Sequence, residues 1–162
     1  EKEINLLIAK EIRRLLEKEK IEVIMVREKD EELGKSKVED LKYRVSLMNE
    51  KKPSLAVSIH QNSYHEENVF GAQVFYYKTS TEGKKAAAVI QEAIQEVNPE
   101  NTKKIKANDT YYLLKKTEVP TVIVECGFLS NYAEAEKLVS EDYQKKVAEA
   151  VTKGILQYLK DQ

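Results

Sequence analysis

The chain has 162 residues, of which 34% are charged and 41% hydrophobic, and its formal net charge is −1. This length and composition predict one globular domain with a hydrophobic core and exclude a disordered chain. The near-zero net charge gives no electrostatic reason to expect a nucleic acid as partner. No apolar run approaches the roughly 20 residues of a membrane span. The single cysteine, Cys126, excludes an intramolecular disulfide.

Helices and strands are predicted to alternate along the first part of the chain. Apolar residues at helical spacing predict a helix over 4–19 and a second helix over 38–51. Between them, the β-rich segment 21–26 predicts a strand, and the charged segment 27–37 predicts a surface loop. The apolar run that begins at Leu55 predicts a buried strand over 55–60.

The central part of the chain is predicted to be more irregular. Residues 62–69 are polar and predict a loop, and the alternating segment 71–78 predicts a strand. A helix is predicted over 82–97, followed by a polar, basic loop over 100–109. Residues 111–115 predict a short strand or an extended segment.

The last part of the chain predicts a strand over 120–125, a short helix over 131–138 and a long helix over 142–160. No repeat, low-complexity tract or linker divides the sequence. The alternation of helices and strands predicts a single α/β domain over 1–162. Its central sheet is expected to be mixed or mostly parallel, with helices on both faces.

Two predicted strands end in side chains that suit a chemical site. His60 follows the run that starts at Leu55, and Glu125 follows Val122-Ile123-Val124. The carboxyl ends of strands are where α/β folds place ligand sites, so one pocket shared by these two side chains predicts metal-assisted hydrolysis. The alternative for Glu125 is a structural carboxylate paired with a lysine or with a nest of backbone N–H groups, and a histidine at a strand end is often only hydrogen-bonded.

Other polar residues have simpler interpretations. Glu1 is an ordinary first-turn residue of a helix, and His65 lies in a polar loop where solvation is expected. The basic run 103–106 is typical of a solvated surface, although it could contact an anionic polymer. Cys126 could be a thiol nucleophile, but a buried small residue is the favoured interpretation. The tyrosines are expected mostly in the core or on strand faces.

Several stretches, which follow one another over essentially the whole chain, resemble the zinc-dependent N-acetylmuramoyl-L-alanine amidases. They are Glu1–Asn5, Ser58–Asn62, Gly71–Tyr77 and Val124–Asn131, the last being the most specific. Within that family, Glu39–Val45 and the stretches Tyr143–Ala148 and Lys153–Ile155 resemble the germination-specific, spore-cortex branch most.

The resemblance implies one zinc ion held by two histidines and a glutamate, with a second glutamate as catalytic acid and base. His60 matches a histidine ligand, Glu1 matches the glutamate ligand, and Glu125 matches the catalytic glutamate. Asn62 and the loop after it are expected to border the substrate cleft. For Glu1 the resemblance replaces the simpler interpretation as a first-turn residue.

One part of the family pattern has no counterpart in the chain as numbered. The family opens with a strand and an Asp-Pro-Gly-His-Gly-Gly motif that supplies the other histidine ligand, and no Gly-His-Gly occurs here. We therefore expect an N-terminally truncated catalytic domain that lacks the first strand of the sheet. Two protein ligands are fewer than the three of a catalytic zinc site, so zinc is expected to be weakly bound or absent.

The expected function is hydrolysis of the amide between N-acetylmuramic acid and L-alanine in peptidoglycan, in maturation of the spore cortex. The resemblance implies an extracytoplasmic location in the cell wall or spore envelope, with membrane attachment only through an N-terminal anchor outside this chain. A regulatory protein is an additional expected partner. The rival hypotheses are a metal-free peptidoglycan-binding or partner-regulated module, and a cysteine hydrolase that uses Cys126.

Overall fold

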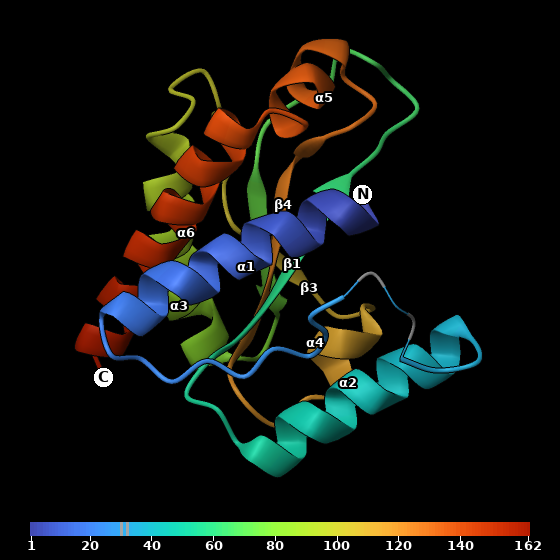
Figure 1. Cartoon of the computed structure of the whole chain (residues 1–162), viewed down its shortest axis with the longest axis vertical. Coiled ribbons are helices and arrows are strands. Elements are labelled where there is room, and N and C mark those ends of the chain that lie inside the picture. The colour runs from blue at the N-terminus through green and yellow to red at the C-terminus, as the bar shows by residue number, and fades with distance from the viewer. Residues whose placement is uncertain (30, 32) are drawn as a thin grey trace.

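The computed structural model describes residues 1–29, 31 and 33–162. Its elements in chain order (Figure 1) are α1 (Lys2–Lys18), α2 (Lys37–Lys51), β1 (Ala56–Asn62), β2 (Gln73–Tyr77), α3 (Thr81–Gln95), β3 (Lys106–Asn108), α4 (Tyr112–Lys116), β4 (Thr121–Phe128), α5 (Tyr132–Leu138) and α6 (Glu141–Lys160). Within the described residues, no helix has the length and apolar character needed to cross a membrane.

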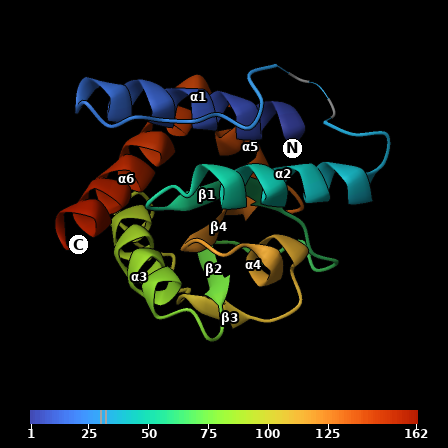
Figure 2. The same cartoon turned by 90° about the horizontal axis from the view of Figure 1, so that it is seen from below.

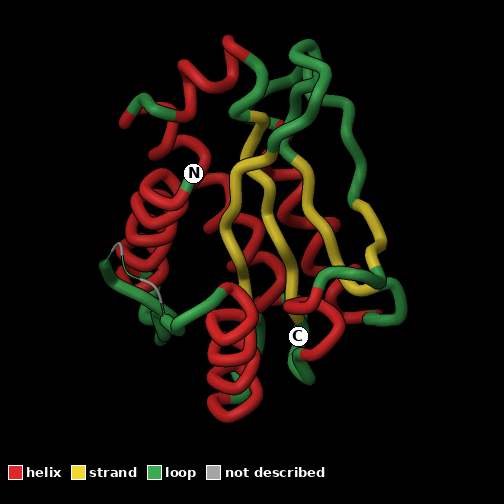
Figure 3. The backbone as a smooth tube through the Cα atoms, turned by 90° about the vertical axis from the view of Figure 1, so that its right-hand side faces the viewer, coloured by secondary structure: helices red, strands yellow, loops and turns green. Residues whose placement is uncertain are grey.

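The strands form one mixed sheet in the order β1-β4-β2-β3, and Figure 3 shows them side by side. β1 runs parallel to β4, and β2 runs parallel to β3, whereas β2 and β4 are antiparallel. Every residue of β4 is buried, as expected for a strand that has neighbours on both sides and helices on both faces. The expected α/β class with a mixed, helix-covered sheet is therefore confirmed.

The two faces of the sheet carry separate apolar clusters. The larger cluster joins α1, α3, α5 and α6 to the side chains of Val74, Tyr76, Val122, Val124 and Cys126. The smaller one joins α2 and α4 to Ala56, Phe75 and Ile123 on the other face. Figure 2 shows α3 and α6 on one side of the strands and α4 on the other. Alternation along each strand thus assigns every side chain to one of these two faces.

Local sequence features define the helices. Ser36, Ser80 and Ser140 each precede a helix and accept a hydrogen bond from a backbone N–H in its first turn. α3 and α6 approach so closely that a Cβ at Gly154 would lie 2.6 Å from Cα of Ile90. Only glycine fits at that position, and the close approach brings two long apolar helix faces together.

The predicted strand over 21–26 is wrong. Ile21 N donates to Leu16 O, which ends α1, and no described strand hydrogen-bonds to the segment that follows. A β-rich sequence becomes a strand only when a neighbour supplies ladder partners. Ile21 and Val23 instead contribute apolar contacts to the larger cluster.

Three further elements differ from the sequence predictions. The polar segment 100–109 contains the short strand β3, and residues 111–115 lie at helix α4 rather than in a strand. Asn108 Oδ1 accepts the N–H groups of Thr110 and Tyr111, so an asparagine turn leads directly into α4. β4 continues three residues beyond Glu125, to Phe128.

Two positions of the loop predicted over 27–37, residues 30 and 32, lie outside the described residues.

The packing of α6 gives a direct stability test. Ile155 is 5% exposed and lies in the larger cluster. We expect Ile155→Ala to lower the free energy of unfolding by about 2–5 kcal/mol, because it removes buried methyl groups and leaves a cavity. Denaturant unfolding measures this change. Lys146→Ala, at an exposed position of the same helix, is the matched control and should change stability little; equal stabilities for the two variants would contradict this packing.

Candidate active site

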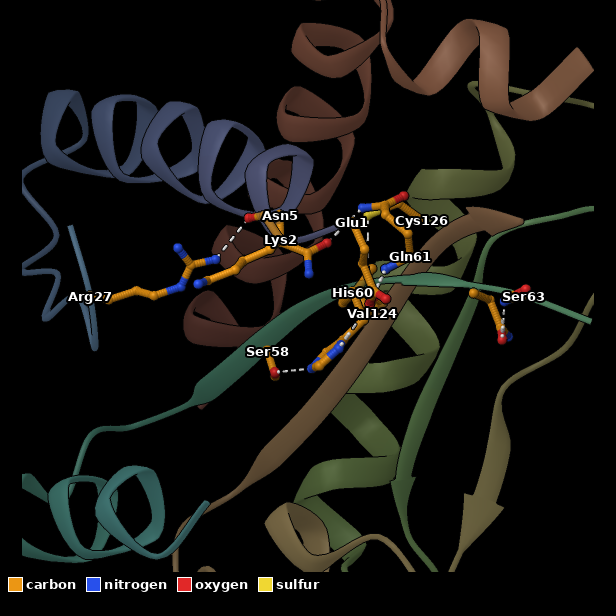
Figure 4. Close-up of polar contacts among 11 residues, drawn as sticks. Glu1, Lys2, Asn5, Arg27, Ser58, His60, Gln61, Ser63, Val124 and Cys126 are labelled. Atoms are coloured by element: carbon orange, nitrogen blue, oxygen red, sulfur yellow. Dashed lines mark hydrogen bonds and ion pairs between the residues drawn. The ribbon is translucent and has the colours of Figure 1, made fainter. Parts of the chain in front are cut away.

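His60 projects from β1 with both ring nitrogens engaged. Its Nε2 lies 2.8 Å from Ser58 Oγ, and its Nδ1 lies 3.4 Å from Glu1 Oε1 (Figure 4). Residues 58 and 60 are two apart on one strand, so their side chains share a face and the serine can orient the imidazole. The hydrogen bond at Nε2 leaves Nδ1 as the nitrogen that faces Glu1.

Glu1 lies where the start of α1 meets the end of β1. Its Oε1 accepts the N–H of Gln61 at 3.1 Å, next to His60. One helical turn further on, Asn5 Oδ1 accepts a hydrogen bond from the Gln61 side chain at 3.0 Å. These two bonds join residues about 60 positions apart, so they hold the Glu1 carboxylate beside the imidazole.

Glu125 lies opposite His60 in the parallel β1–β4 ladder. The residue is 9% exposed, and its Oε2 is buried without a hydrogen-bond partner among the described residues. Burial raises the pKa of Glu125 to about 7, and the negative charge of Glu1 adds to the shift. A carboxyl with a pKa near neutrality can both accept and return a proton at physiological pH.

The environment favours the neutral form of His60. Burial lowers the pKa of the imidazole, the carboxylate of Glu1 acts in the opposite direction, and Arg44 adds to the lowering. Neutral imidazole is the form that binds metal ions. Among the three side chains, His60 and Glu1 therefore offer ready donor atoms, and Glu125 offers a proton acceptor.

These side chains open into a cavity of about 720 Å³. Its walls come from α1, α2, the strand β1 and the turn that leads into α4. Tyr111 from that turn also lines the cavity, and its ring packs against Phe75 at a centroid distance of 5.7 Å. Burial raises the pKa of Tyr111, and the negative charge of Glu125 adds to the shift. The cavity is large enough to admit a peptide segment beside Glu125.

The donor atoms fit a zinc ion as part of a ligand set. His60 Nδ1 and Glu1 Oε1 are close enough to touch one cation, and nitrogen and carboxylate oxygen are both zinc ligands. The unpartnered Oε2 of Glu125 is an additional polar atom in the same place. Among the described residues, no cluster of three or more His, Cys, Asp or Glu side chains could hold a metal by itself. Whether His60 and Glu1 bind zinc stays a prediction.

A β-bulge brings Asn62 and Phe128 to the same face as the site. His60 pairs with Glu125, but the next pair is Asn62 with Phe128, so β4 has one extra residue over this interval. Without the bulge, alternation would turn Phe128 to the opposite face. Asn62, the predicted substrate-binding residue, lies two residues beyond His60, and its carbonyl accepts the N–H of Leu129 at 2.8 Å.

His65 and Cys126, which were considered as site residues from the sequence, do not lie in the site. His65 is exposed, and its ring stacks on Tyr64 at a centroid distance of 4.1 Å. Cys126 is 1% exposed and faces the larger apolar cluster, and burial raises the pKa of its thiol to about 12. A thiol that stays protonated and lies on the other face from Glu125 is a poor nucleophile, which argues against a cysteine hydrolase.

Sequence reasoning missed residues that position the site. Ser58 and Gln61 were read only as parts of a motif, and Tyr111 lies in a segment predicted as extended. Glu134 was not considered, although its buried Oε1 accepts the N–H groups of Gly71 and Phe128 at 2.9 and 2.8 Å. In the sequence, Glu134 stands three residues after the helix-capping Asn131. That spacing predicts the start of a helix, but it does not predict contacts with residues distant in the sequence.

Comparisons with known proteins agree on one family. Residues 1–157 match the sequence profile of the N-acetylmuramoyl-L-alanine amidases. The chain is 37% identical over 166 residues to the germination-specific N-acetylmuramoyl-L-alanine amidase of Bacillus subtilis, a match that covers 98% of this chain and 70% of that protein.

Solved structures give the same result at the level of the fold. The CwlD amidase from Clostridioides difficile, in complex with the GerS lipoprotein, matches with a TM-score of 0.95 and 36% identity, over 99% of this chain and 86% of that one. An N-acetylmuramoyl-L-alanine amidase from Clostridium difficile 630 matches with a TM-score of 0.90 and 31% identity, over 99% of this chain and 84% of that one.

The raised pKa of Glu125 predicts a pH-dependent stability in metal-free protein. The folded state holds the proton up to about pH 7, whereas the unfolded chain releases it near 4.5. The protonated carboxyl thus favours folding at low pH, and this advantage is lost as the pH rises from about 4.5 through 7. Relative to wild type, Glu125→Gln should gain about 2–3 kcal/mol of stability between pH 4.5 and 8.

Denaturant unfolding at both pH values, with a chelator present, measures this gain. Glu136→Gln, at an exposed position of α5, is the control and should follow wild type at both pH values. If Glu125→Gln also follows wild type, the carboxyl is ionised at no unusual cost and the pKa assigned to it is wrong.

Proposed function

The chain belongs to the N-acetylmuramoyl-L-alanine amidase family, and we propose that its Glu125 site hydrolyses the amide between N-acetylmuramic acid and the L-alanine of a stem peptide. The observation that supports this most is the buried Oε2 of Glu125, which has no hydrogen-bond partner among the described residues, on a residue that pairs with His60 and lies within reach of the charge of Glu1. An amide hydrolase needs such a group, because water must lose a proton and the leaving amine must gain one.

Each side chain has a separate task in the proposed reaction. Glu125 accepts a proton from the attacking water and returns it to the nitrogen of the leaving alanine. Ser58 holds the His60 ring through Nε2, and Gln61 holds the Glu1 carboxylate through its backbone N–H. The cavity that Tyr111 lines receives the substrate, and Asn62 contacts the substrate from the end of β1, outside the residues that line the cavity.

Zinc dependence is part of the proposal. His60 Nδ1 and Glu1 Oε1 would hold the ion, together with a further ligand that the family places upstream of Glu1. A zinc ion bound there would supply Lewis acidity toward the amide carbonyl. The hydrogen bond between Ser58 Oγ and the opposite ring nitrogen supports this role, because an imidazole that binds a metal through Nδ1 carries its proton on Nε2, and donation of that proton to the serine oxygen fixes the ring orientation.

We further propose that the protein acts on peptidoglycan outside the cytoplasm, in maturation of the spore cortex. The likeness to the germination-specific amidase of Bacillus subtilis supports that role. A protein partner is also proposed, because the CwlD amidase was solved in complex with the GerS lipoprotein and this chain matches that amidase over 99% of its length.

The alternative is a peptidoglycan-binding or partner-regulated module without metal or catalysis. Among the residues that the structure describes, no group of three or more His, Cys, Asp or Glu side chains is arranged to hold a metal ion. The two proposals differ in whether the protein takes up zinc and in whether Glu125 matters for turnover.

The first test concerns zinc. In protein that also carries the histidine ligand upstream of Glu1, we predict about one zinc per chain, and loss of that zinc in His60→Ala. Elemental analysis after dialysis measures the content. His65→Ala, which changes an exposed histidine of a neighbouring loop, is the matched control and should retain the metal. Equal zinc in wild type and His60→Ala would remove His60 from the ligand set.

The second test concerns proton transfer. Glu125→Gln keeps the size of the side chain and removes its basicity. In the same upstream-extended protein, turnover of purified muropeptides should fall by about 10²–10⁴-fold, with fold and zinc content retained. Chromatography of the released stem peptides follows the reaction. Wild-type turnover in the glutamine variant would show that Glu125 is structural, and the proposed mechanism would have to be abandoned.

A further inference from the structure

The basic segment 103–106 lies along the same face of the sheet as the site. Lys106 pairs with Phe75 in the β2–β3 ladder, and Gln73, two residues before Phe75, pairs with Glu125. The side chain of Gln73 also donates to Lys104 O at 2.8 Å. Because paired residues on neighbouring strands point to one face, this segment adjoins the face that carries Glu125.

The side chain of Lys103 is positioned by contacts with Phe128 and Gly71. Its ammonium lies over the ring of Phe128, 5.3 Å from the centroid. A Cβ at Gly71 would lie 3.2 Å from its Cδ, so the aliphatic stem runs past that glycine. Phe128 is the residue that the bulge turns to the face of His60 and Glu125. The ammonium is therefore held on the catalytic face, beyond the end of β4.

The backbone of Lys103 is fixed as firmly as its side chain. Its N–H donates to Asn101 Oδ1 at 3.1 Å, and its carbonyl accepts hydrogen bonds from the side chains of Gln91 and Gln95. Gln91 and Asn101 are 4% and 5% exposed. A buried amide side chain that loses its hydrogen-bond partner costs free energy, so Gln91 and Asn101 hold the backbone of Lys103 in one position.

The charge of Lys103 has no partner of opposite sign in the described part of the chain. Its ammonium forms none of the ion pairs found there, in contrast to Lys78, which pairs with Asp109 at 2.9 Å. The site itself contains the carboxyl groups of Glu1 and Glu125. An anionic peptide would be repelled by these groups unless a cation nearby compensated for them.

We propose that Lys103 binds the free carboxylate of the residue that follows the alanine in the stem peptide. Phe128 pairs with Asn62, which lies two residues beyond His60, so Phe128 lies about 7 Å along the sheet from Glu125. An extended peptide rises by about 3.3–3.6 Å per residue, so a group on the second residue after the scissile amide reaches this position. The second residue of the stem is a γ-linked glutamate whose α-carboxyl is free in some peptidoglycans and amidated in others. Lys103 thus selects the acid over the amide.

This inference deepens the proposed amidase function and rests on it. Binding, measured with a chelator present so that no turnover occurs, tests it separately from cleavage. The probes are synthetic N-acetylmuramoyl-L-alanyl-γ-D-glutamyl-L-lysine and the same compound with the glutamate α-carboxyl amidated. We expect wild type to bind the acid roughly five- to tenfold more tightly than the amide, as for a partly exposed charge-assisted contact.

Variants locate the effect at Lys103. Lys103→Gln should lose affinity for the acid and bind the amide as wild type does, and Lys103→Arg should restore the preference. Lys104→Gln is the matched control, because Lys104 is exposed in the same segment and belongs to no ring contact found there. Equal binding of acid and amide by wild type would overturn the inference without any variant, and so would an equal loss of both probes in Lys103→Gln. Absence of cleavage in the turnover assay would instead contradict the proposed function.

Discussion

The site depends on the carboxyl group of Glu125, whose Oε2 is buried by folding and has no hydrogen-bond partner among the described residues. Glu125 ends an otherwise apolar run in β4, which has β1 and β2 on either side and is buried along its whole length. Packing against both neighbours places the carboxyl, and burial together with the nearby charge of Glu1 raises its pKa to about 7. An unpaired buried carboxyl is costly, and such a cost persists where function needs the group.

The remaining features of the site follow from how the chain surrounds this residue. The parallel ladder places His60 opposite Glu125, and α1 brings Glu1 to the end of β1 through the backbone of Gln61. The bulge in β4 then adds Asn62 and Phe128 to the same face, so that the floor of the site extends past the reacting centre. Two long-range contacts and one extra residue in β4 therefore bring these side chains together at the carboxyl ends of β1 and β4.

The strands and helices that build the site could be predicted where a local sequence pattern reflects burial in the folded protein. The run before Glu125 is apolar because β4 is buried throughout, and the run before His60 is apolar although β1 is mostly half-buried rather than buried as predicted, so both strand ends were visible in the sequence. The amphipathic stripes of α1, α3 and α6 were visible for the same reason. The role of Glu1 came only from resemblance, because a glutamate at a helix start usually serves the helix dipole.

What could not be predicted depends on neighbours that are distant in sequence. Residues 21–26 have strand-like composition but no ladder partner among the described strands, and three residues suffice for β3 because β2 supplies one. The bulge is a property of pairing between β1 and β4, so neither strand reveals it alone. Tyr111 becomes a site residue only because the turn at Asn108 starts a helix beneath the cavity.

The central claim is that Glu125 holds its proton to near-neutral pH in the folded, metal-free protein. Infrared difference spectra of wild type against Glu125→Gln, recorded as a pH titration, isolate the carboxyl band of this one side chain. The account predicts a protonated carboxyl band that disappears with a midpoint near pH 7. A midpoint near 4.5, the ordinary value for a glutamate, would contradict it, because Glu125 would then be an ordinary carboxylate with no special capacity to return a proton to the leaving amine.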